Sequence, residues 1–202
     1  SIVYEFEEPI QNSDQNPYGI DFIVYGNVQK SETGESYSSG MEPAAVMVSQ
    51  DGNTWYELAG SDYYERTTQH NISMTYTNPD TTFKSAVDIP WTDSTGASGT
   101  VKANTYHSQA YYPDPLNYGE TNKGTGENKS YTDGSMTVSG TRVSNSAALN
   151  FGYGDTHANA AGNDNTAVNP YRENPNYNTN GDGMDISWAV DADGNPVQLD
   201  SV

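Results

Sequence analysis

Hydrophobic and polar residues alternate along this chain over short distances, in the pattern of strands. No stretch carries apolar side chains at the i, i+3, i+4 and i+7 spacing of an amphipathic helix. Short apolar or alternating runs predict strands at residues 2–6, 20–25, 44–48, 55–58, 72–76, 135–140, 147–151, 186–190 and 197–199. We therefore expect an all-β fold, an antiparallel, jelly-roll-like β-sandwich with long ordered loops and little or no helix.

Two turns containing Asp-Gly join pairs of these predicted strands. Asp51-Gly52 separates 44–48 from 55–58, and the run Asp-Ala-Asp-Gly-Asn at 191–195 separates the last two strands. Both predict β-hairpins, because such turns need positive φ. Between the strands lie long irregular stretches at 26–42, 77–134 and 153–183. Loops of this length in a compact domain indicate a function, a bound ion or disorder.

The composition narrows the class of protein. The chain has 202 residues, 8 basic and 27 acidic, for a net charge of −19. This excess of acid argues against binding to nucleic acid or to anionic lipid, both of which need basic clusters. There is no Cys and no run long enough to insert into a membrane. We expect one module over residues 1–202, trimmed at both ends, because the chain starts in one strand pattern and stops in another.

Four motifs occur in a fixed order along the chain: residues 17–27 (PYGIDFIVYGN), Glu42-Pro43, residues 46–56 (VMVSQDGNTWY) and residues 181–188 (GDGMDISW). In this combination the chain resembles a β-domain of large secreted or cell-wall proteins of gut Firmicutes. The resemblance implies an extracellular module at the bacterial cell surface, with other domains of a larger protein as neighbours. It implies no catalytic residues.

Calcium is the cofactor that the acidic residues suggest. Asp21 stands inside an apolar run, Asn27 follows it, and Asp182 and Asp185 precede another strand. A hard cation takes clustered carboxylate and amide oxygens, and a buried carboxylate needs a partner. With few basic residues available, we expect these side chains to hold calcium. The alternative is that Asp21 accepts hydrogen bonds from backbone N–H groups, or points outward from an edge strand.

Asp191 and Asp193 are further candidate calcium ligands, because residues 191–195 resemble the opening of an EF-hand loop. Pro196 replaces the Gly that such a loop requires, and Val202 replaces its bidentate Glu. A plain hairpin turn is the alternative interpretation.

Aromatic side chains supply the candidate ligand-binding residues. Trp91, Tyr111 and Tyr112 are expected to be exposed and to stack on sugar rings. Trp55 and Trp188 lie in strand patterns, so we expect them to pack in the core.

No motif indicates catalysis. The chain lacks a Gly-x-Ser-x-Gly elbow, its three His form no metal-binding pair, and no local motif supports a glycosidase carboxylate pair. We expect a non-catalytic binding or adhesion module whose loops are stabilised by calcium, with a glycan or a surface protein as ligand. The alternatives are a carbohydrate-binding module that uses exposed aromatics, and a structural spacer or self-assembling surface subunit.

Overall fold

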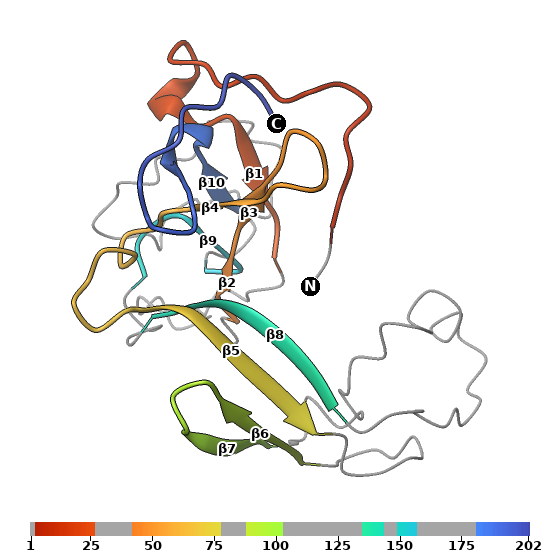
Figure 1. Cartoon of the computed structure of the whole chain (residues 1–202). Coiled ribbons are helices and arrows are strands. Elements are labelled where there is room, and N and C mark those ends of the chain that lie inside the picture. Colours follow the sequence, from red (N-terminus) through yellow and green to blue (C-terminus); the bar gives the residue numbers. More distant parts are fainter. Residues whose placement is uncertain (1–2, 27–41, 78–87, 103–134, 144–148, 157–180) are drawn as a thin grey trace, which may run out of the picture. The chain divides into compact units, whose positions relative to one another are not determined.

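The computed structural model describes residues 3–26, 42–77, 88–102, 135–143, 149–156 and 181–202. Within these ranges the chain forms strands and short 3₁₀ helices (Figure 1). Every strand pairing is antiparallel. The predicted all-β class with little helix is therefore confirmed, whereas the sandwich arrangement stays a prediction.

The elements follow one another along the chain as follows: η1 (Pro17–Gly19), β1 (Phe22–Val24), β2 (Ala44–Ala45), β3 (Met47–Val48), β4 (Tyr56–Leu58), β5 (Gln69–Thr77), β6 (Ile89–Asp93), β7 (Ser98–Val101), β8 (Ser135–Arg142), β9 (Tyr153–Gly154), β10 (Asp182–Met184), η3 (Ile186–Trp188) and β11 (Ala189–Val190).

The predicted module at 1–202 contains two compact units. Unit 1 consists of Ser1–Thr68 and Val143–Val202, and unit 2 is the continuous segment Gln69–Arg142. The two ends of unit 2 lie side by side, because Gln69 pairs with Arg142 across β5 and β8. In sequence, unit 2 is therefore one continuous insertion between the two segments of unit 1.

Unit 1 is held together by pairing between residues far apart in the sequence. Strand β1 pairs with β10, β2 pairs with β9, and β4 lies between β3 and β11. The first of these pairings sets Phe22 opposite Met184, and the third sets Leu58 opposite Ala189. Early and late segments thus bring their apolar residues to one place.

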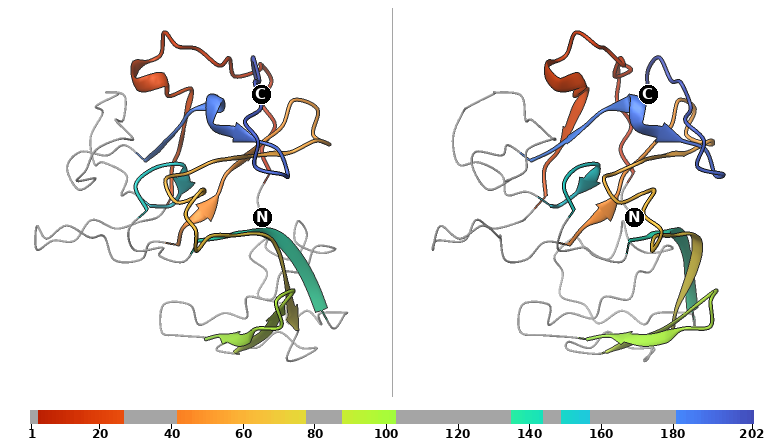
Figure 2. Two further views of the ribbon diagram at one scale, coloured as in Figure 1. Left: turned by 60° about the vertical axis from the view of Figure 1, so that its left-hand side comes forward. Right: turned by 90° about the vertical axis from the view of Figure 1, so that its left-hand side faces the viewer.

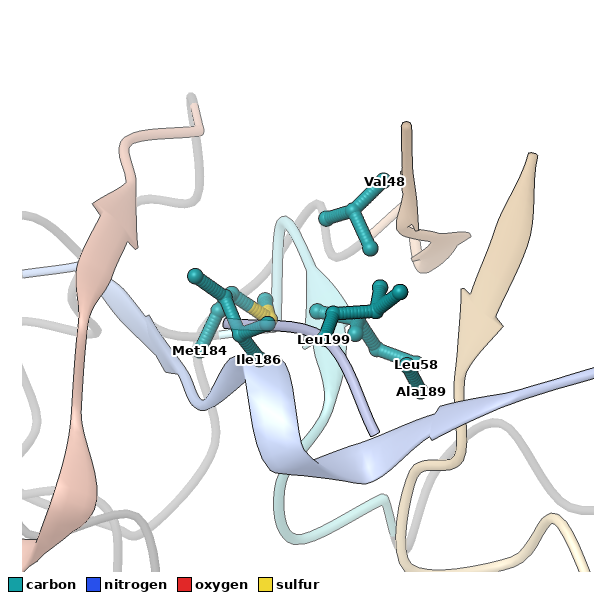
Figure 3. Packing of buried hydrophobic residues seen from close by; sticks show 6 residues of the cluster. All are labelled: Val48, Leu58, Met184, Ile186, Ala189 and Leu199. Atoms are coloured by element: carbon teal, nitrogen blue, oxygen red, sulfur yellow. The ribbon is translucent and has the colours of Figure 1, made fainter. Parts of the chain in front are cut away.

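A small apolar cluster forms the core of unit 1 (Figure 3). Its members come from β3, β4, β10, η3, β11 and the C-terminal segment: Val48, Leu58, Met184, Ile186, Ala189 and Leu199. Met184 and Ile186 are completely buried. Each large apolar side chain in such a place stabilises the fold by about 1.5–3 kcal/mol. The segment 182–190 therefore contributes most to the core.

Several predicted strands of unit 1 differ from the structure. Residues 3–6 form no strand, and Val3 and Tyr4 are 68% and 75% exposed. Pairing with the C-terminal segment occurs later, where Ile10 and Val202 exchange backbone hydrogen bonds of 2.8 and 2.9 Å. The predicted strand 186–190 begins as the 3₁₀ turn η3, because the Asp185 side chain caps it. Residues 197–199 are also outside any strand.

Unit 2 is a four-stranded sheet with the order β7-β6-β5-β8 (Figure 2). Strands β5 and β8 confirm the predictions for 72–76 and 135–140. The β6–β7 hairpin, however, lies in a stretch that the sequence predicted to be irregular. Its turn depends on Asp93, whose Oδ1 accepts from the N–H groups of Thr95 and Ala97, and on Gly96 at φ +88°.

Trp91 lies across this hairpin, over Gly99. The two residues are partners in the β6–β7 register, and a Cβ on Gly99 would lie 2.6 Å from Cζ2 of Trp91. The absent side chain at 99 leaves the space that the indole occupies. The partly buried Trp91 ring thereby covers a glycine that otherwise weakens a strand.

Gly99→Ala tests this packing. The added methyl group meets the indole, so we expect a loss of about 1–3 kcal/mol in the stability of unit 2, in the range of overpacked cores. Chemical denaturation followed by Trp fluorescence is the measurement. Gly140→Ala in β8 is the matched control, because a Cβ there has no atom within 4 Å. Equal stability of the two variants would contradict the proposed contact.

Candidate functional site

Asp21 joins an N-terminal loop to the C-terminal part of unit 1. Its Oδ1 accepts hydrogen bonds from the N–H of Ser13 and from Nδ2 of Asn16, both at 2.9 Å. Its Oδ2 accepts from the N–H of Ile186 at 2.9 Å, and its own N–H donates to the Met184 carbonyl. The carboxylate is thus satisfied by three donors of the chain itself. This is the geometry of the alternative interpretation, in which backbone N–H groups take the place of a cation.

Asp185 lies next to this arrangement. It caps η3 by accepting from the N–H of Ser187 at 2.8 Å. A Cβ on Gly19 would lie 2.8 Å from Oδ2 of Asp185, and Gly19 has φ +73°. Glycine is therefore required at position 19, both for the backbone conformation and for the close approach of the carboxylate.

Asp182, at the start of β10, lies apart from Asp21 and Asp185. It is paired with Val24, whereas Asp21 bonds to the chain at Met184. The buried carboxylate of Asp182 accepts from the N–H of Thr156 at 3.1 Å and from the Thr156 hydroxyl. The structure thus brings Asp21 and Asp185 together and sets Asp182 beside a different loop.

Asp191 and Asp193 lie in a turn that Asp191 organises. Oδ1 of Asp191 accepts from the N–H groups of Asp193 and Asn195, each at 2.9 Å. These bonds, led by that from Asn195, lower the pKa of Asp191. Asp51 serves the other predicted hairpin in the same way, accepting from Asn53 and Thr54 at 2.8 Å, and its pKa is also lowered. In both turns a carboxylate accepts hydrogen bonds from backbone N–H groups of the residues that follow it.

No group of three or more acidic or histidine side chains suited to a metal ion occurs among the residues that the structure describes. Asn27 lies outside the described residues. Calcium binding stays a prediction, and at Asp21 a cation would have to compete with three hydrogen-bond donors.

Of the three aromatic candidates, the structure describes only Trp91. Tyr111 and Tyr112 lie outside the described residues. Trp91 is partly buried, and the guanidinium of Arg142 lies over its ring at 5.7 Å from the centroid. With Gly99 and Arg142 in contact with the indole, Trp91 presents little open ring surface for a sugar.

Aromatic residues other than these three candidates are also exposed. Tyr18, Tyr64 and Trp55 are 54%, 65% and 38% exposed. Trp55 was expected in the core, but it lies at the end of the Asp51 turn, where its Nε1 donates to the Gly52 carbonyl. Trp188 does pack against the core, beside Phe151.

Tyr18 stands out among them because of its backbone. It has φ 60°, in the left-handed region that a residue with a Cβ adopts only at a cost. The preceding Pro17 and Asn16, and the following Gly19, are the turn-forming residues that signal such a loop in the sequence. A strained, exposed aromatic residue on a loop fixed by Asp21 is a candidate contact for a ligand.

In unit 2, Asp93 and Arg142 belong to a structural cluster of charged and hydroxyl groups. Arg142 makes an ion pair of 2.7 Å with Asp93, whose side chain is inaccessible to solvent. The hydroxyl of Thr95 donates to Asp93, and with the guanidinium of Arg142 and the N–H groups of Ala97 and Thr95 it lowers the pKa of Asp93 to about 2. The cluster fixes the β6–β7 turn against β8.

Asp21→Asn distinguishes the two interpretations of that carboxylate. If the chain's own donors hold it, the amide weakens three hydrogen bonds, and we expect a loss of about 1–3 kcal/mol in stability. Thermal melting after EDTA treatment, with and without millimolar calcium, is the measurement, and we expect the same loss in both. Asp14→Asn, at an exposed position, is the control for the charge change. A loss confined to the calcium-loaded protein would instead identify Asp21 as a metal ligand.

The Asp93 cluster predicts a dependence on pH. The folded-state pKa lies below the value of 3.8 for a free Asp, so the stabilisation is complete above that value and declines as the pH falls toward about 2. We expect Asp93→Asn to be less stable than the wild type at pH 6 and to approach it near pH 2. Urea denaturation at both pH values is the measurement. A constant difference between the variants would show that ionisation of Asp93 is not the cause.

Comparison with known proteins adds no relative: no family model matches the chain, and no curated protein is similar to it in sequence. Among the described residues, no helix is long and apolar enough to cross a membrane.

Proposed function

We propose that this chain is a non-catalytic binding or adhesion module of a bacterial cell-surface protein. The observation that carries the proposal is Tyr18, an exposed tyrosine held in a left-handed conformation by a loop that Asp21 fixes to the core segment. A loop that is already ordered loses little entropy when it binds, and tyrosine offers a large contact surface with a polar end. The cell-surface location rests on the sequence resemblance.

The carboxylates support a non-catalytic role. A general acid or base exchanges a proton with its substrate and needs a free oxygen directed toward it. Asp21, Asp182 and Asp185 each accept hydrogen bonds from N–H groups of the chain. Their arrangement is that of loop-forming residues.

Calcium belongs to the proposal as a stabiliser of the loops. At pH 7 the charge of −19 repels the compact state, and a divalent cation at carboxylates outside the Asp21 arrangement relieves this repulsion. Calcium sites of extracellular modules bind at about 10⁻⁴–10⁻³ M, so the melting experiment above with millimolar calcium also tests this part.

Binding to an array of immobilised host and plant glycans and to mucus glycoprotein tests the proposal. We expect binding by the wild type, and loss of it in Tyr18→Ala and Tyr18→Gly. Tyr18→Gly also relieves the backbone strain, so its melting temperature is expected to be at least that of the wild type, which separates binding from folding. Tyr4→Ala removes a tyrosine that is 75% exposed and is the matched control. Undiminished binding by both Tyr18 variants would exclude this loop as the ligand contact.

A further inference from the structure

The sheet of unit 2 has two faces of different chemistry. Residues paired across antiparallel strands point to the same side, and neighbours along a strand point to opposite sides. The register aligns Tyr76 with Trp91 and Gly99 on one face. It aligns Thr75 with Thr92 and Ser98 on the other, and Thr137 of β8 is the backbone partner of Thr75.

The second face consists almost entirely of hydroxyl residues. Its described positions on β5, β6 and β7 are Ser73, Thr75, Thr77, Pro90, Thr92, Ser98 and Thr100. We call these residues the hydroxyl face. The five from Thr77 onward are exposed, whereas the opposite face includes the buried side chains of Ile72 and Ile89. The hydroxyl face is therefore the side of the sheet that solvent reaches.

Within β5, β6 and β7 the described positions of the hydroxyl face carry no charged residue, although the chain has 27 acidic ones. The next positions in the same alternation, Asp88 before β6 and Lys102 after β7, form an exposed ion pair of 2.6 Å with each other. The ion pair of Asp93 and Arg142 involves the other face. Asp93 and its register partner Met74 each lie two residues along the strand from Trp91 and Tyr76, so they share the face of those two side chains. A face whose nearest cation, Lys102, is paired with a carboxylate does not suit nucleic acid. A face without large apolar side chains does not suit the core of a protein interface, which is rich in aromatic residues.

We propose that the hydroxyl face binds a neutral polysaccharide. Each hydroxyl both donates and accepts hydrogen bonds, as the hydroxyls of a sugar do. The absence of net charge, with Asp88 and Lys102 paired at the edge of the face, matches a neutral chain. The hydroxyl positions repeat at about 4.8 Å from strand to strand and at about 6.8 Å between alternate residues of one strand. This repeat favours an extended, repeating ligand over a small molecule. The proposal rests on the proposed function as a binding module but uses residues other than Tyr18.

Affinity electrophoresis in gels containing amylose, barley β-glucan, galactomannan or inulin tests the inference, with polygalacturonate as the acidic comparison. We expect retardation by at least one neutral polymer and none by polygalacturonate. Thr92→Val keeps the β-branched shape and removes the central hydroxyl. Combined with Ser98→Ala it is expected to weaken binding about tenfold, as the loss of a few neutral hydrogen bonds would. Thr92→Asp is expected to abolish binding.

Three controls make the result decisive. Thr54→Val makes the same change at an exposed threonine of unit 1 and should leave binding unchanged. Tyr18→Ala reports on the proposed function separately. Melting curves of all variants show that unit 2 remains folded.

Three results would overturn the inference. Equal binding by Thr92→Val/Ser98→Ala and the wild type would place the polysaccharide elsewhere, and the proposed function would stand. Binding to the array through Tyr18 without retardation by any neutral polymer would show that the hydroxyl face binds none of these polymers, and the proposed function would stand. Self-association that Thr92→Asp abolishes, measured by sedimentation, would identify the hydroxyl face as a contact between copies of the chain.

Discussion

The hydrogen bonds of the Asp21 carboxylate connect the parts of unit 1 that the rest of its structure depends on. One oxygen holds the loop of Ser13 and Asn16, and the other holds the N–H of Ile186, 165 residues away in sequence. Hydrogen bonds to a charged acceptor are about twice as strong as neutral ones. Ile186 belongs to the buried cluster, so the same interaction positions the core segment and orders the loop that carries Tyr18.

Carboxylates perform this task repeatedly in the described chain. Asp51, Asp93 and Asp191 each accept two backbone N–H groups within a turn, and Asp185 caps η3. A chain with few basic residues and a small core gains much of its local order this way. Part of the acidic composition thus serves turns that need an acceptor.

The two units divide the exposed chemistry between them. Unit 1 displays aromatic residues on loops whose backbone is fixed, and unit 2 displays hydroxyl residues on one face of a sheet whose other face holds Trp91, Ile72 and Ile89. These are the two surfaces on which the proposed binding rests. The ion pair of Asp93 and Arg142 and the fit of Trp91 on Gly99 support the sheet from the side opposite the hydroxyl face.

The sequence by itself determined the all-β class, the two Asp-Gly turns and the importance of Asp21, because alternation, turn chemistry and a carboxylate in an apolar run are local signals. It did not reveal the β6–β7 hairpin, since Pro90 and Gly99 are atypical of strands and Gly99 is explained only by the indole of Trp91. It also left open what Asp21 binds. Only the tertiary structure brought Ser13, Asn16 and Ile186 to that carboxylate, and the hydroxyl face likewise depends on register between strands. Pairing between distant segments decides such features, and no local pattern encodes it.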